Sequence, residues 1–246
     1  MHSAWCEEIA HCNIYARLTA DFFCSIVSVM KLPLIQKPFR YRYFDAATML
    51  VVVNAAIYFL SDFIWPSLND SLALIPMGIK ADGHWWTVVT YMFAHGSTMH
   101  LFSNMFGLII FGRIMEKTIG SIEFLLFYFF SGIMCGLSSY WYYCSNGEYW
   151  VALIGASGCI YSIMVLFALL YPRARVYVFG IVPMKAWLLV IVYFFIEYFS
   201  QSRADGIAHA THLFGLLFGL IYAVVRMGIN PFAAFKEKPA DGSAGK

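Results

Sequence analysis

The sequence has 246 residues, of which 61% are hydrophobic and only 12% are charged. Soluble domains carry about 25% charged residues. A mean hydropathy of +0.69 excludes a disordered chain, a collagen and a coiled coil. The net charge of +2 is too small to indicate nucleic-acid binding. The six cysteines have no CxxC spacing and predict buried or incidental thiols. The composition therefore predicts a polytopic membrane protein.

Apolar segments remain when the chain is divided at charges, prolines and glycines, and a membrane-crossing helix needs about 20 such residues. The predicted spans are 46–65, 97–112, 122–143, 157–171, 184–199 and 207–225. We therefore predict an all-α bundle of six transmembrane helices. The second and fourth spans are short, which predicts that these helices begin inside a water-accessible cavity below the outer surface.

Lysine and arginine predict the orientation of the bundle. With the N-terminus inside, 14 of the 16 Lys and Arg residues fall on the inner side, and only Lys80 and Arg203 fall outside. Both termini are therefore predicted to be cytoplasmic. We expect an N-terminal segment over 1–45, a membrane domain over 46–226 and a disordered tail over 227–246. Residues 1–29 lack the pattern of a signal peptide, and Met30 is a candidate for the true start.

The connection over 66–94 is predicted to be external, long and rich in aromatic residues. Two interpretations stay open for it. It is either an interfacial anchor or a lid that forms a partly embedded platform.

Polar residues inside the apolar spans are the functional candidates, because such groups are costly in a membrane. Ser157 opens the fourth span within Gly155-Ala-Ser-Gly158, a motif that also suits simple helix packing. His212 precedes Gly215 and Gly219, and all three are predicted to share one helix face. A helix packed closely on this GxxxG face would bring a hydroxyl within reach of the imidazole.

Depth supports that pairing. At about 1.5 Å per residue, Ser157, His212 and His100 all stand about 20–24 Å above the cationic inner ends of their helices. A neutral imidazole can take the proton of a serine hydroxyl, which predicts Ser157 as nucleophile and His212 as base. No acidic residue is expected near His212 at this depth. We therefore predict a Ser-His dyad and not a triad.

Three further side chains complete the predicted site. Asn104, His100 and the backbone N–H of Ser157 are candidate donors to an oxyanion. Tyr161 lies four residues after Ser157 on the same helix face, where it is expected to stack on the base and orient it.

Four motifs occur together, over 95–104, 112–121, 155–161 and 211–219. Their residues and order resemble the rhomboid intramembrane serine proteases. The resemblance implies a six-helix core, Ser157 as nucleophile, His212 as base and an oxyanion hole at His100 and Asn104. It also implies that the connection over 66–94 dips into the membrane, although the family often has Trp-Arg where this chain has Trp85-Trp86.

The same resemblance implies substrates and location. The expected substrates are single-span membrane proteins, cut near a small residue where the helix unwinds easily. A lipid bilayer is the expected surrounding, with no cofactor, metal or nucleic acid. A six-helix core without an additional helix is the form expected in a bacterial plasma membrane.

Alternative functions are less well supported. A zinc protease needs His-Glu-x-x-His, and no acidic residue occurs between Gly83 and Met115. An aspartyl protease needs two membrane aspartates, and only Asp62 qualifies. The remaining alternative is an inactive rhomboid-like protein that binds client helices, or a transporter-like scaffold. His209 lies close to the outer loop and is not expected to be the base, while Glu197 is interpreted as a snorkelling or gate residue.

Overall fold

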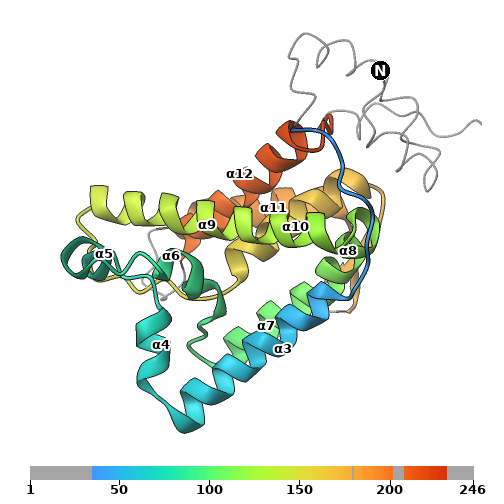
Figure 1. Cartoon of the computed structure of the whole chain (residues 1–246). Coiled ribbons are helices and arrows are strands. Elements are labelled where there is room, and N and C mark those ends of the chain that lie inside the picture. The colour runs from blue at the N-terminus through green and yellow to red at the C-terminus, as the bar shows by residue number, and fades with distance from the viewer. Residues whose placement is uncertain (1–34, 179, 202–207, 232–246) are drawn as a thin grey trace, which may run out of the picture. The chain divides into compact units, whose positions relative to one another are not determined.

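The computed structural model describes residues 35–178, 180–201 and 208–231 (Figure 1). One compact unit covers 39–222, and the described part of the other consists of 35–38 and 223–231. In the smaller unit, Gln36 donates from Nε2 to the carbonyl of Val225 over 3.2 Å, and Arg226 donates to the carbonyl of Lys37 over 3.0 Å. The predictions for 1–29 and for the tail after Pro231 lie outside the described residues.

Apolar helices dominate the described residues, which confirms the predicted helical bundle. Within the described residues, three helical stretches are long and apolar enough to cross a membrane, namely Ala46–Ile64, Thr98–Ile119 and Ser121–Ser145. The first consists of α3 (Ala46–Phe59) and the π-helical η2 (Leu60–Ile64). The second consists of α7 (Thr98–Gly107), the π-helical η4 (Leu108–Gly112) and α8 (Arg113–Ile119). The third is α9 (Ser121–Ser145). Three shorter apolar helices are α10 (Ser157–Leu170), α11 (Ala186–Ser200) and α12 (His209–Val225).

The second predicted span was too short. We predicted its end at Gly112, but the helix continues without a break to Ile119. Arg113 and Lys117 are exposed in this extension, while Glu116 is fully buried. Charges did not end the helix because each one is either solvated or used in a buried network.

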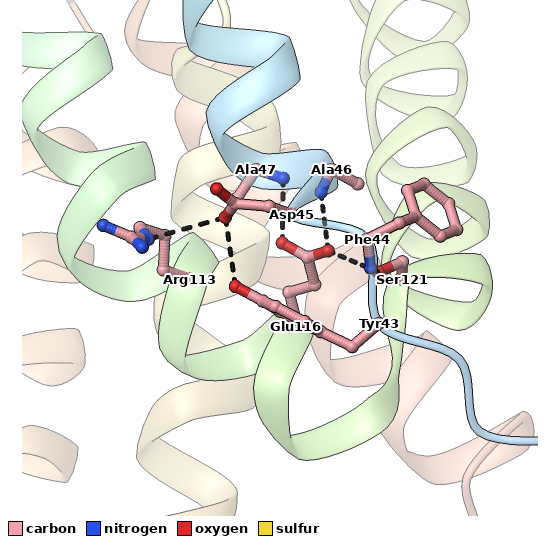
Figure 2. A network of polar contacts seen from close by, with 8 residues as sticks. All are labelled: Tyr43, Phe44, Asp45, Ala46, Ala47, Arg113, Glu116 and Ser121. Atoms are coloured by element: carbon pink, nitrogen blue, oxygen red, sulfur yellow. Dashed lines mark hydrogen bonds and ion pairs between the residues drawn. The ribbon is translucent and has the colours of Figure 1, made fainter.

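Figure 2 shows this network around Glu116. Its carboxylate accepts hydrogen bonds from the backbone N–H groups of Ala46 (2.6 Å) and Ala47 (2.9 Å), the first two residues of α3. The hydroxyl of Ser121 also donates to it and accepts from the backbone N–H of Phe44. Free N–H groups at a helix start favour negative charge. Glu116 therefore joins the starts of α3 and α9 to α8.

The connection over 66–94 contains three short helices, α4 (Ser67–Leu72), α5 (Pro76–Asp82) and α6 (Thr87–Thr90), and the 3₁₀ turn η3 (Tyr91–Phe93). Both α5 and α6 pack against α9. The hydroxyl of the buried Tyr91 donates to the carbonyl of Gly132 over 2.7 Å. Trp85 and Trp86 remain more than half exposed. The connection is therefore folded and carries exposed aromatic rings, and its two interpretations, anchor and lid, stay predictions.

A β-hairpin between α10 and α11 was not predicted. Strands β1 (Arg175–Val178) and β2 (Val182–Lys185) pair antiparallel, with Arg175 opposite Lys185. Valine and tyrosine favour strands, and the hairpin turn contains Gly180 with a φ of +72°. The fifth helix therefore begins at Ala186 and not at the predicted Met184, which lies in β2.

Candidate active site

Ser157 is the first residue of α10, and its side chain is partly accessible. No side chain of the described residues caps this helix start, so the first backbone N–H groups of α10 remain available as donors. The chain enters the helix through Gly155, whose φ of +109° is one that other residues rarely adopt. The N–H of Gly155 donates to the carbonyl of Tyr91 over 2.9 Å, which fixes the turn before the serine.

The structure brings Ser157 and His212 together. Nε2 of His212 lies 2.8 Å from Oγ of Ser157, which is hydrogen-bonding distance. The ring of Tyr161 stacks on the imidazole with centroids 4.4 Å apart and planes only 8° from parallel. The hydroxyl comes from α10 and the imidazole from α12, so this pair depends on how closely the two helices approach.

Glycines permit that approach. A β-carbon on Gly215 would overlap the backbone carbonyl of Gly158, and one on Gly219 would lie 2.7 Å from the carbonyl oxygen of Ser162. The hydroxyl of Ser162 donates to the carbonyl of Gly215 over 2.6 Å and joins the two backbones directly. Gly215 and Gly219 therefore form the face on which α10 packs, at a distance that only small residues allow.

His100 and Asn104 lie on α7 and reach the turn before Ser157. A β-carbon on Gly155 would lie 2.6 Å from Nε2 of His100 and 3.4 Å from Nδ2 of Asn104. Nδ2 of Asn104 is buried and has no hydrogen-bond partner among the described residues. An amide donor left unpaired beside the turn that leads into Ser157 suits a ligand oxygen.

The sequence analysis did not predict the position of Glu197 beside the candidate base. We expected no acidic residue near His212, but Oε1 of Glu197 lies 3.0 Å from its Nδ1. The two atoms are at ion-pair distance, although the ring N–H is not aligned for an ideal hydrogen bond. The prediction that His212 has no carboxylate beside it was wrong. Glu197 lies in the last turn of α11 and His212 in the first turn of α12, which places the carboxylate beside the imidazole.

The same carboxylate has two further partners. The hydroxyl of Tyr161 donates to Oε1, and Nδ1 of His209 lies 2.5 Å from Oε2. His209 therefore contacts Glu197, while His212 is the imidazole paired with the serine. Glu197, His209 and His212 each offer one possible metal-ligating atom, and these atoms lie within 4.8 Å of one another.

Comparisons with known proteins identify the family. The rhomboid domain model matches residues 82–228, which is more than half of the sequence. The chain belongs to the rhomboid family. This rhomboid chain is 29% identical over 168 residues to the mitochondrial RHOMBOID-like protein 12 of Arabidopsis thaliana, a match that covers 60% of this chain and 48% of that protein.

Bacterial relatives carry protease names. Rhomboid protease GlpG of Haemophilus influenzae is 24% identical over 146 residues, which covers 59% of this rhomboid chain and 72% of the relative. Rhomboid protease GluP of Bacillus subtilis is 27% identical over 196 residues, which covers 77% of this chain and 36% of the relative. The chain thus spans about half of the Arabidopsis protein and about a third of GluP. Since relatives come from both bacteria and organelles, a bacterial plasma membrane stays a prediction.

Proposed function

We propose that this rhomboid is an intramembrane serine endopeptidase in which Ser157 is the nucleophile and His212 the general base. The observation that carries the proposal is the 2.8 Å contact between Nε2 of His212 and Oγ of Ser157. The family membership and the names of GlpG and GluP support a protease. The alternative is an inactive rhomboid-like protein that binds client helices, and an intact pair of nucleophile and base favours the enzyme.

The proposed reaction has two stages. In the first, Oγ of Ser157 bonds to the scissile carbonyl carbon while its proton moves to Nε2 of His212. The imidazolium then gives that proton to the leaving nitrogen, the C–N bond breaks and an acyl-enzyme remains. In the second stage water attacks the ester, again losing a proton to His212, and Ser157 regains its own.

An oxyanion forms in both stages and needs donors. Nδ2 of Asn104, the ring of His100 and the backbone N–H of Ser157 at the start of α10 are the proposed donors. The first two converge on Gly155, two residues before the nucleophile. Donors that are already oriented before the charge appears stabilise the transition state most.

The position of the candidate active site indicates the class of substrate. We propose single-span membrane proteins, cut near a small residue where the helix unwinds, because the nucleophile lies among apolar helices. The membrane domain is proposed to cover residues 46–226, with both termini in the cytoplasm. No cofactor is required by the proposed chemistry.

Labelling with a fluorophosphonate probe in detergent tests the proposal. Such probes react with activated serines, so the wild-type protein should be labelled and Ser157→Ala should not. Ser157→Ala and His212→Ala should also each abolish cleavage of a model single-span substrate, because the two side chains act as one unit. Absence of both labelling and cleavage in the folded wild-type protein would favour the inactive client-binding alternative.

A further inference from the structure

Glu197 is a buried carboxylate with donors from two other helices. It is only 4% exposed, and its neighbours are Tyr161 on α10 with His209 and His212 on α12. A buried carboxylate is costly unless it is paired and hydrogen-bonded. An apolar residue at this position would avoid that cost, so the presence of a carboxylate beside an imidazole indicates a functional role.

The proposed reaction of His212 gives the carboxylate of Glu197 a chemical role. To accept the proton of Ser157, His212 must present an unprotonated Nε2, so its own proton must be on Nδ1. Oε1 of Glu197 lies 3.0 Å from Nδ1, on the side of the ring away from the serine. A carboxylate there favours the required tautomer and stabilises the imidazolium that forms during the reaction.

We infer that Glu197 is a positioning residue for His212, so that the site works as a Ser157–His212–Glu197 triad. This inference rests on the proposed function. It replaces the dyad that the sequence predicted.

The second oxygen explains how the carboxylate keeps its direction. Oε2 is held by Nδ1 of His209 at 2.5 Å, which leaves Oε1 turned toward His212. Tyr161 donates its hydroxyl to Oε1 and stacks its ring on the same imidazole. Two contacts thus fix the carboxylate and one fixes the ring plane. Two further ionisable groups face this cluster, His100 on α7 near His212 and Tyr193 on α11 against Tyr161. Neither can supply a negative charge as readily as Glu197.

Steady-state cleavage of a single-span substrate by Glu197→Gln tests the inference. The amide keeps the shape but removes the charge and can donate to Nδ1, which favours the wrong tautomer. We expect kcat to fall about 100- to 10,000-fold while KM changes less than about threefold. Glu197→Asp keeps a carboxylate on a shorter side chain and should recover part of the lost kcat. A merely structural glutamate would show no such split between kcat and KM.

Glu123 provides a matched control. It is also buried, and it accepts a hydrogen bond from the hydroxyl of Tyr222 over 2.5 Å, but it lies on α9 away from His212. Glu123→Gln should lower thermal stability and leave kcat per folded molecule near the wild-type value. Cleavage by Glu197→Gln at the wild-type rate, with Ser157→Ala inactive, would overturn the inference and leave the proposed function intact.

Histidine ¹⁵N spectra of the resting protein test the same idea without altering Glu197. With the signal assigned by comparison to His212→Ala, the ring of His212 should carry its proton on Nδ1. A proton on Nε2 would overturn the inference even if Glu197→Gln failed to fold.

A chelator tests whether the same three side chains bind a metal, and it should leave the cleavage activity unchanged. Loss of activity that zinc restores would mean that Glu197, His209 and His212 hold a metal, and would also overturn it.

Discussion

Gly215 on α12 lies against the backbone of Gly158 on α10, so closely that a β-carbon would overlap the Gly158 carbonyl. Gly158 directly follows the candidate nucleophile, and Gly215 is three residues after the candidate base. The absence of two side chains therefore sets the distance between Ser157 and His212.

Gly215→Val should separate these helices and impair the reaction without touching either reacting group. A misplacement of about 1 Å can cost on the order of 100-fold in rate. We expect the rate of fluorophosphonate labelling to fall by about that factor, together with a lower melting temperature in detergent.

Leu217→Val is the control for that variant, because Leu217 lies on the same helix with 48% of its surface exposed. It should be labelled at the wild-type rate. Labelling of Gly215→Val at the wild-type rate would mean that the distance between the hydroxyl and the imidazole does not depend on this contact.

Asn104→Ala should reduce turnover. Removal of one oxyanion donor typically costs about 100- to 1000-fold in kcat. The effect should appear in kcat and not in KM, because the donor is needed only when the negative charge has formed. Turnover unchanged in this variant would assign Asn104 to packing.

His100→Ala should show a similar loss of kcat with a larger structural effect. The ring of His100 lies edge-on to that of the buried His95, with centroids 5.1 Å apart. Its removal therefore also opens a gap beside the turn before Ser157. A melting temperature lower than that of Asn104→Ala is the expected sign, and equal stability of the two variants would argue against the packing contribution.

Tyr161 has two contacts that separate variants can distinguish. Tyr161→Phe keeps the ring that stacks on His212 and loses the hydroxyl that donates to Glu197. One hydrogen bond to a charged group is worth about 1.5–3 kcal/mol, so activity should fall by about 10- to 150-fold at most. Tyr161→Leu loses both contacts and should fall further. Equal rates for the two variants would show that the stacked ring contributes nothing to orienting the base.

Glu116→Ala should destabilise the protein and leave the chemistry intact. The substitution strands the N–H groups of Ala46 and Ala47 and the hydroxyl of Ser121 (Figure 2). Breaking a buried hydrogen-bond network of this kind costs about 2–5 kcal/mol. The melting temperature should drop clearly, while kcat per folded molecule stays within about twofold of wild type. Ser121→Ala, which leaves the carboxylate on both N–H groups, should be milder.

The sequence alone predicted the membrane bundle and the pair of Ser157 and His212. The length of an apolar segment indicates a helix that crosses the lipid, because the thickness of the membrane requires a similar length of every span. Helical periodicity placed His212 on the face of Gly215, and depth counted along each helix set the two side chains at one level. These are properties of single helices, so they can be read along the chain.

Contacts between side chains on different helices were decided only by the tertiary structure. Glu197 on α11 lies 3.0 Å from His212 on α12, and hydropathy along the chain does not show which faces of two helices meet. The second span continues past Gly112 because Glu116 is buried on the start of α3, a contact across 70 residues of sequence. A charged residue in a helix has a cost that depends on what packs against it. Sequence shows the charge, but the packing that satisfies it exists only once the helices have assembled.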